Sequence, residues 1–192
     1  DDPYSLFLDD APPALASLAP ASVFHIATLA KTLTPGLRTA FVLGPDQDSR
    51  RNVLAAMRSF AVMAAPLMGM LTTHWIASGA ARQILDGVRA EALARQQLAR
   101  QLLPGPFPAA AAGIHLWQPL SDGWTAADLE RVARDEGLSV TSSEVFHQGL
   151  GAPNAIRISL GSIPERQALA QALERLAGLV RRRPHGLRDV IV

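Results

Sequence analysis

The first quarter of the chain alternates between short apolar runs and polar loops. Residues 22–28 (SVFHIAT) and 39–43 (TAFVL) are rich in apolar and β-branched side chains, which predicts two buried strands. The ten residues between them, LAKTLTPGLR, are more polar and contain the turn signal Pro35-Gly36. The pattern therefore predicts strand, loop and strand, with Lys31 in the loop.

The middle of the chain follows a helical period. Asp48 or Ser49 is expected to cap a helix that runs towards Met63, and Pro66 to separate it from a second helix that ends near Ile76. A long amphipathic helix is expected from Ala80 to Pro104. Its apolar positions recur at helical spacing: Ile84, Val88, Ala92, Leu98 and Leu102. A linker rich in Pro and Ala follows at residues 105–112.

The C-terminal part predicts a small α+β unit. Thr125 is expected to cap a helix through Arg134, and Ser162 with Glu165 to form a capping box for a helix that ends at Val180. Strands are expected at residues 114–120, 138–140, 145–146 and 155–160. We accordingly divide the chain into residues 1–78, part of a larger domain, and residues 79–192, the long helix with the small domain.

Composition excludes several functional classes. The chain has 192 residues, no cysteine and a net charge of +1, so a disulfide framework, a thiolate metal site and a cysteine nucleophile are excluded. The balanced charge does not point to nucleic acid or a membrane surface. The opening residues Asp1-Asp2-Pro3 do not resemble a signal peptide, and the apolar stretch 60–71 is shorter than the roughly 20 residues that span a bilayer. We expect a cytoplasmic protein with no membrane segment.

Lysine usage is the sharpest compositional signal. The chain has 17 arginines and one lysine, Lys31. Arginine replaces lysine readily on a solvated surface, but it cannot lose its proton and attack a carbonyl. A lone lysine in an arginine-rich chain therefore marks Lys31 as a candidate for amine chemistry. The alternative is that this one lysine is present by chance and has no function.

Three segments carry a resemblance to a known family. DDPY (residues 1–4), ATLAKTLTPGLR (27–38) and AIRISLG (155–161) resemble, in order and spacing, the C-terminal landmarks of fold-type I proteins that bind pyridoxal phosphate (PLP). The helical middle and HLWQPLSDGW (115–124) are similar to the aminotransferase-like domain of MocR regulators, a branch of the GntR transcription factors. The resemblance implies an α/β fold, namely the C-terminal part of the fold-type I aminotransferase fold, preceded in the full protein by further sequence.

The resemblance implies a role for the residues around the cofactor ring. Lys31 would bond PLP as an imine. Asp1 would keep the pyridine nitrogen protonated, with Asp2 as the alternative if the register shifts by one residue. Tyr4 would donate a hydrogen bond to the phenolic oxygen of the ring. Asp1-Asp2 can also be read as an ordinary cap or turn.

The resemblance also implies two anion sites. Arg38, seven residues after Lys31, would bind the cofactor phosphate together with the Thr28 hydroxyl. Ala30 departs from the family pattern, in which serine commonly precedes the lysine, so one phosphate hydrogen bond is missing. Arg157 would bind the α-carboxylate of an amino acid, although by itself it could be a surface arginine on an edge strand.

Three functions fit these residues. We favour the effector-sensing domain of a MocR-type regulator, in which an amino acid or another amine binds at PLP and an N-terminal domain binds DNA. The alternative is a PLP-dependent aminotransferase that acts on an amino acid and a 2-oxo acid, with Lys31 as the general base. A degenerate domain that binds no cofactor is supported only by Ala30. In the first two cases we expect a homodimer.

Overall fold

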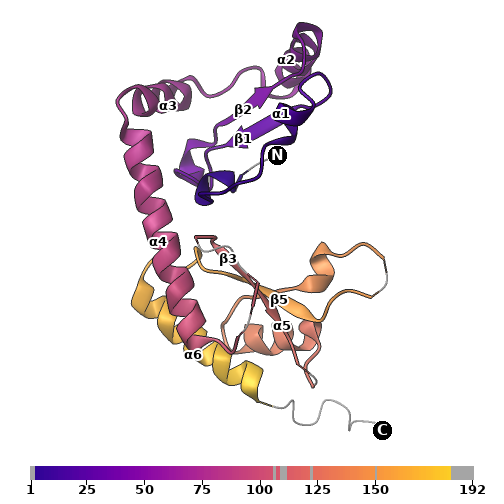
Figure 1. Ribbon diagram of the computed structural model, residues 1–192, viewed down its shortest axis with the longest axis vertical. Helices are drawn as coiled ribbons and strands as arrows, with labels where there is room; N and C mark the ends of the chain where they lie inside the picture. The colour runs from indigo at the N-terminus through magenta and orange to yellow at the C-terminus, as the bar shows by residue number, and fades with distance from the viewer. Residues whose placement is uncertain (1–2, 106, 109–111, 122, 150, 183–192) are drawn as a thin grey trace. The chain divides into compact units, whose positions relative to one another are not determined.

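The protein divides into two compact units that share one long helix. The structure, a computed structural model, describes residues 3–105, 107–108, 112–121, 123–149 and 151–182. The two units are Asp1–Ala90 and Glu91–Val192. Helix α4 (Ala80–Leu102) belongs to both, since its first turns lie in the first unit and its later turns in the second (Figure 1).

The first unit contains the expected pair of strands. Strand β1 (His25–Thr28) pairs with β2 (Ala40–Leu43) in the antiparallel sense, with Thr28 opposite Ala40. Both strands lie where the apolar runs predicted them, although β1 begins three residues later. Large parallel sheets commonly carry one antiparallel strand, so this pairing is compatible with a piece of a mixed sheet.

The expectation that these strands are buried is wrong for this chain. Phe24 and Ile26 are exposed, and so are three successive residues of β2, namely Phe41, Val42 and Leu43. Successive strand residues point to opposite faces, so both faces of the hairpin have exposed apolar side chains. The reason is that, among the described residues, the sheet contains only these two strands. Two strands alone cannot bury two apolar faces.

Three helices flank the hairpin in the sequence. They are α1 (Leu15–Leu18), α2 (Gln47–Ala61) and α3 (Pro66–Ala77). Asp46, rather than Asp48 or Ser49, caps α2, because its carboxylate accepts a hydrogen bond of 2.7 Å from the Ser49 N–H. Pro66 occupies the first position of α3, where its missing N–H costs nothing.

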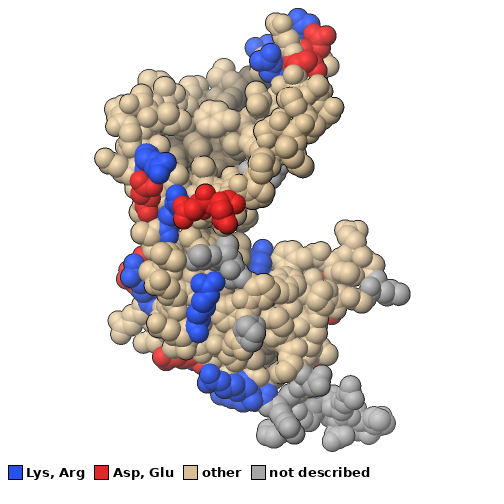
Figure 2. All heavy atoms as spheres, in the orientation of Figure 1, with Lys and Arg blue, Asp and Glu red and all other residues tan. Residues whose placement is uncertain are grey.

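A groove of about 230 Å³ lies between α2 and the hairpin and is lined by Phe24, Ala40, Val42, Gly44, Arg50, Val53, Leu54 and Met57. Figure 2 shows charged side chains gathered over α2, whereas the visible face of the hairpin is largely uncharged.

The second unit is a three-stranded antiparallel sheet with helices on one face. Strand β5 (Ala155–Ser159) lies between β3 (His115–Pro119) and β4 (Thr141–Ser142). The strands predicted at 114–120 and 155–160 are confirmed. The strand predicted at 138–140 is displaced to Thr141–Ser142, and residues 145–146 belong to a 3₁₀ turn, Ser143–Phe146, instead of a strand. Two apolar residues alone could not distinguish a strand from a turn.

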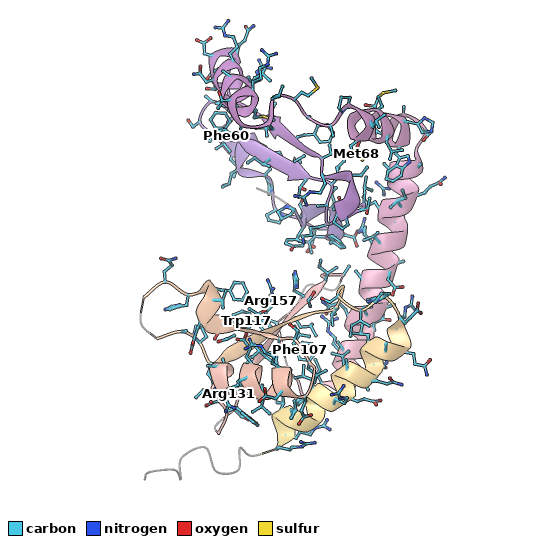
Figure 3. The ribbon with its side chains drawn as sticks, turned by 180° about the vertical axis from the view of Figure 1, so that it is seen from behind. Phe60, Met68, Phe107, Trp117, Arg131 and Arg157 are labelled. Carbon is cyan, nitrogen blue, oxygen red and sulfur yellow. The ribbon has the colours of Figure 1, made fainter. Side chains whose placement is uncertain are left out.

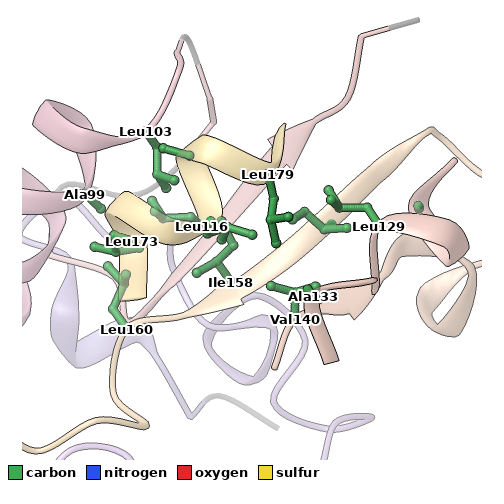
Figure 4. Packing of buried hydrophobic residues seen from close by; sticks show 14 of the residues in the cluster. Ala99, Leu103, Leu116, Leu129, Ala133, Val140, Ile158, Leu160, Leu173 and Leu179 are labelled. Carbon is green, nitrogen blue, oxygen red and sulfur yellow. The ribbon is translucent and has the colours of Figure 1, made fainter. Parts of the chain in front are cut away.

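The core of the second unit lies on the inner face of this sheet. Helices α5 (Ala126–Asp135) and α6 (Arg166–Arg181) and the end of α4 contribute its apolar side chains (Figure 4). Leu116, Ile156 and Ile158 from the sheet are at most 4% exposed. Thr125 caps α5 as predicted, because its hydroxyl accepts a hydrogen bond from the Asp128 N–H. The alternation of buried and less buried residues along β5 also follows the sequence prediction.

The capping box predicted at Ser162 and Glu165 is wrong. Helix α6 begins at Arg166, and neither Ser162 nor Glu165 caps it with a side chain. Instead, Arg95 of α4 holds the connection before the helix. Arg95 as a whole residue is 8% exposed, and its guanidinium donates to the carbonyl oxygens of Leu160, Ile163 and Pro164 at 2.5–2.7 Å.

Glu91 completes this network, and its pKa provides a test. Hydrogen bonds from Arg166 and then Arg95 lower the pKa of the Glu91 carboxyl from 4.5 to about 2. A lowered pKa in the folded state stabilises the fold above the unfolded value, and this contribution is lost as the pH falls towards 2. In denaturant titrations of the full-length protein, we expect Glu91→Gln to be less stable than wild type at pH 6. The difference should shrink between pH 4.5 and pH 2. Glu174→Gln, an exposed glutamate on α6, is the control, and a Glu91→Gln difference that does not change with pH would contradict the assignment.

Two kinds of feature are absent from the described part of the chain. None of its helices combines the length and the apolar character needed to cross a membrane. Within those same residues, no group of three or more His, Asp or Glu side chains could hold a metal ion.

Candidate functional site

The loop between β1 and β2 is a fixed structure that presents Lys31. The Leu29 N–H donates to the Thr39 carbonyl at 3.2 Å, which extends the β ladder by one bond beyond Thr28. The Leu29 carbonyl in turn accepts bonds from the N–H groups of Leu33 at 2.9 Å and Thr34 at 3.2 Å. These bonds close a tight turn around residues 30–32, so Lys31 lies at its apex.

The second half of the loop turns the chain and presents Arg38. Thr34 caps the 3₁₀ turn Pro35–Leu37, because its hydroxyl accepts a hydrogen bond from the Gly36 N–H at 3.3 Å. Leu37 is 2% exposed and anchors the turn, whereas Arg38 is exposed. Arg38 adopts the left-handed conformation, with φ of 47°, which costs a non-glycine residue about 1–2 kcal/mol. This conformation carries the chain from the turn into β2.

Three of the sequence-predicted site residues thus lie on one hairpin. Lys31 and Arg38 are exposed, and the side chain of neither makes a hydrogen bond or ion pair with another residue in the part of the chain that the structure describes. The Thr28 hydroxyl oxygen accepts a hydrogen bond from the Ala30 N–H at 3.2 Å. This contact uses the oxygen and leaves the hydroxyl proton available for an anion. The hairpin therefore offers two cations and a hydroxyl donor to a ligand.

The residues predicted to contact the cofactor ring lie at the start of the chain. Asp1 and its alternative Asp2 lie outside the described residues. Tyr4 is described: it is 37% exposed, and its ring lies 6.4 Å from that of the buried Phe7. The roles assigned to Asp1 and Tyr4 stay predictions.

Sequence reasoning missed Thr32, the residue after Lys31. Thr32 is only 2% exposed, and its hydroxyl has no hydrogen-bond partner among the described residues. A buried hydroxyl without a partner costs about 1–3 kcal/mol. The sequence carries no signal for this, because burial of a threonine in a polar loop depends on contacts that only the folded chain defines.

In the second unit, Arg157 lies at the centre of the three-stranded sheet. Its neighbours Ile156 and Ile158 point into the core, so Arg157 points to the opposite face, as the alternation predicted. Trp117 of β3 and Thr141 of β4 are its partners on either side. The reading of Arg157 as an edge-strand arginine is therefore wrong, because β5 is the central strand.

Aromatic side chains surround the Arg157 guanidinium. Its Cζ lies 4.9 Å from the centre of the Phe146 ring, and Phe146 contacts Trp117 edge to face with 6.0 Å between ring centres. Arg157 and Trp117 lie side by side in Figure 3. Trp117 is half-buried and, like Arg157, lies on the face of the sheet away from the core.

The polar contacts of Arg157 are sparse. Its Nη2 approaches the Thr141 hydroxyl at 3.5 Å, the long limit of a hydrogen bond. Its Nε is buried without an acceptor, and no carboxylate pairs with it within the described ranges. By contrast, Arg95 and Arg166 are both paired with Glu91. A partly buried guanidinium without a counter-ion is suited to binding an anion.

A separate cavity lies elsewhere in this unit. It has a volume of about 580 Å³ and is lined by Pro104, Gly105, Gln118, Pro119, Leu120, Ser121, Trp124, Val180, Arg181 and Arg182. None of the sequence-predicted site residues lines it, and Arg182 is already paired with Glu136. The candidate residues are therefore those of the hairpin loop in the first unit and, separately, Arg157 in the second unit.

Comparison with solved structures decides the fold. The α-aminoadipate aminotransferase LysN of Thermus thermophilus, crystallised with N-(5'-phosphopyridoxyl)-L-leucine, superimposes with a TM-score of 0.78 at 23% sequence identity. This match covers 94% of the chain and 49% of LysN. The kynurenine aminotransferase of Pyrococcus horikoshii also gives a TM-score of 0.78, at 16% identity over 91% of the chain. The chain has the fold-type I aminotransferase fold.

Sequence relatives of this aminotransferase-fold chain include both regulators and enzymes. The uncharacterized HTH-type transcriptional regulator YdeF of Bacillus subtilis is 32% identical over 175 residues, which are 90% of the chain and 38% of YdeF. The 2-aminoadipate transaminase of Thermus thermophilus is 25% identical over 92% of the chain and 47% of the enzyme. No family model matches the chain. The chain thus spans less than half the length of these relatives.

Proposed function

We propose that the chain is the PLP-binding, effector-sensing part of a transcription regulator whose DNA-binding domain lies elsewhere in the full-length protein. The observation that carries this proposal is the 32% identity to the HTH-type regulator YdeF over 90% of the chain. A second HTH-type regulator of Bacillus subtilis, YdfD, is 26% identical over 83% of the chain. Since a regulator can bind DNA through a separate domain, the balanced charge of this chain fits the proposal.

The residues of the hairpin fit PLP as the cofactor. Lys31 has an exposed amine that no other described group engages, which is what covalent attachment to an aldehyde requires. Arg38 and the Thr28 hydroxyl on the same hairpin would hold the cofactor phosphate. When bound, PLP supplies an electron sink for amine chemistry. Asp1 and Tyr4 are proposed to contact the ring at its nitrogen and its phenolic oxygen.

Arg157 is proposed to bind the α-carboxylate of the effector. Its guanidinium is partly buried and lacks a carboxylate partner among the described residues, so a ligand carboxylate would supply the missing charge. The effector class is therefore an amino acid, whose amino group would exchange with Lys31. The full-length protein is proposed to be a homodimer, as the resemblance to fold-type I proteins implies.

An aminotransferase is the second candidate. The 25% identity to 2-aminoadipate transaminase over 92% of the chain favours it, and an enzyme would use the same residues, with Lys31 also moving the substrate proton. The fold cannot distinguish the two functions.

One pair of measurements on the full-length protein separates them. A regulator should bind the DNA upstream of its own gene in fluorescence anisotropy, and its affinity should change when PLP and an amino acid are present. In stopped flow with a panel of amino acids, it should convert PLP to the pyridoxamine form slowly or not at all. Fast conversion without DNA binding would establish the aminotransferase instead.

The phosphate role of Arg38 has a test of its own. Arg38→Ala should weaken PLP binding about 10- to 150-fold, because a hydrogen bond to a charged group contributes about 1.5–3 kcal/mol. Alanine adds no backbone strain that arginine does not already have at this left-handed position. Arg58→Ala, an exposed arginine on α2, is the control. Equal PLP affinity of wild type and Arg38→Ala in equilibrium dialysis would overturn the assignment.

A further inference from the structure

The Arg157 guanidinium lies over an aromatic ring and has few polar contacts. Its Cζ is 4.9 Å from the centre of the Phe146 ring. Among the described residues, the one polar contact on its terminal nitrogens is the 3.5 Å approach to Thr141. A guanidinium binds a carboxylate through its N–H groups, and a neighbouring aromatic ring brings no oxygen acceptor that competes for them.

We propose that Phe146 is a positioning residue for Arg157, which fixes the plane of the guanidinium so that its N–H groups are ready for the carboxylate of the ligand. This inference rests on the proposed function, in which Arg157 binds that carboxylate. Phe146 need not touch the ligand for this role. Its effect is on the affinity for a carboxylate and not on the affinity for an amine.

The segment that carries Phe146 is itself fastened to the sheet. The 3₁₀ turn Ser143–Phe146 follows β4 directly, and the Ser142 hydroxyl caps it by accepting a hydrogen bond from the Glu144 N–H at 3.3 Å. The Ser143 hydroxyl, which is buried, donates to the Pro153 carbonyl just before β5. These bonds tie the turn to the strand that bears Arg157, so Phe146 has a defined place beside it.

Trp117 also contacts the Phe146 ring. It is directly opposite Arg157 on β3 and meets Phe146 edge to face, a geometry that aromatic pairs prefer. Phe146 is therefore held between the turn that carries it and Trp117. Since long side chains lose rotamer freedom on binding, an arginine that is already ordered binds its ligand with a smaller entropy loss.

The proposal is tested with two ligands that differ only in the carboxylate. L-Leucine and 3-methylbutylamine share the amino group and the side chain. Their dissociation constants are measured on the PLP-loaded full-length protein, from the initial spectral change in stopped flow before any turnover. The readout is the ratio of the two constants, which reports the contribution of the carboxylate alone.

The proposal predicts a defined pattern of ratios. Phe146→Leu should weaken L-leucine binding about 2- to 30-fold, the range expected for a cation–π contact of 0.5–2 kcal/mol, and leave the amine unchanged. Phe146→Tyr keeps the ring and should behave like wild type. Val145→Ala alters an exposed neighbour in the same turn and is the control.

Three outcomes would overturn the proposal, and they are distinguishable. If Arg157→Ala leaves the ratio unchanged, then Arg157 does not bind the carboxylate and the proposed function fails at this residue. If Arg157→Ala changes the ratio but Phe146→Leu does not, only the positioning role is wrong. If Phe146→Leu weakens both ligands equally, the role of Phe146 is structural.

Discussion

Replacing Lys31 with alanine is expected to abolish covalent attachment of PLP. Lys31 is the only lysine of the chain, and its amine lies at the apex of a fixed loop without a partner among the described residues. No arginine can take its place, because a guanidinium stays protonated and does not attack an aldehyde. We expect the visible absorbance of the PLP-loaded full-length protein to disappear in the Lys31→Ala variant.

Peptide mapping after borohydride reduction provides the decisive measurement. In wild type, the pyridoxyl group should be found on the peptide that contains Lys31, and the assignment within this chain is unambiguous because the chain has one lysine. Lys31→Arg is the matched control, since it keeps the positive charge and removes the nucleophile. A wild-type protein that carries no pyridoxyl group on Lys31, or a Lys31→Arg variant that still binds PLP covalently through this chain, would refute the central proposal.

Replacing Arg95 with alanine is expected to have the largest effect on stability. The Arg95 guanidinium donates to the carbonyl oxygens of Leu160, Ile163 and Pro164 and to the Glu91 carboxylate, so its removal leaves buried and partly buried acceptors without a donor. Each buried acceptor that loses its donor costs about 1–3 kcal/mol. We expect a loss of this size in denaturant titration.

Two variants make the Arg95 test specific. Arg82→Ala removes an exposed arginine from the same helix, where its pair with Asp86 contributes about 0.2–1 kcal/mol. Arg95→Lys should recover only part of the stability, because an ammonium lacks the planar fork that reaches several acceptors at once. Hydrogen exchange should show the loss of protection first in α6, which begins directly after the segment that Arg95 holds. A cost no greater than that of Arg82→Ala would contradict the assigned role.

The elements that sequence predicted well are those with a strong local signal. The long helix α4 and strand β5 agree closely with their apolar periodicity, and Thr125 caps α5 as expected. The errors fall where the local signal is short. At Ser162 and Glu165 a capping pattern is present but unused, because Arg95, some seventy residues earlier, fixes that segment by contacts that no local pattern contains.

The residues of the candidate site also differ in how strong a signal the sequence gives for them. Lys31 is singled out by composition, and Arg157 by its place in an alternating strand. Thr32 and Phe146 had no signal of their own. Phe146 was expected in a strand, and its place over the Arg157 guanidinium follows from a 3₁₀ turn and from the pairing of β4 with β5.

The sequence by itself determined which residues have the chemistry: one lysine amine, an arginine seven residues later, and an arginine on the face of a strand away from the core. Only the tertiary structure decided which groups are left without partners and what surrounds them. Arg95 and Arg157 illustrate the reason, since both are arginines that directly follow an apolar residue. Arg95 is saturated by carbonyl oxygens and a carboxylate, whereas Arg157 meets aromatic rings and no carboxylate within the described residues. Whether a charged side chain stabilises the fold or stays available for a ligand depends on the acceptors that distant segments bring to it.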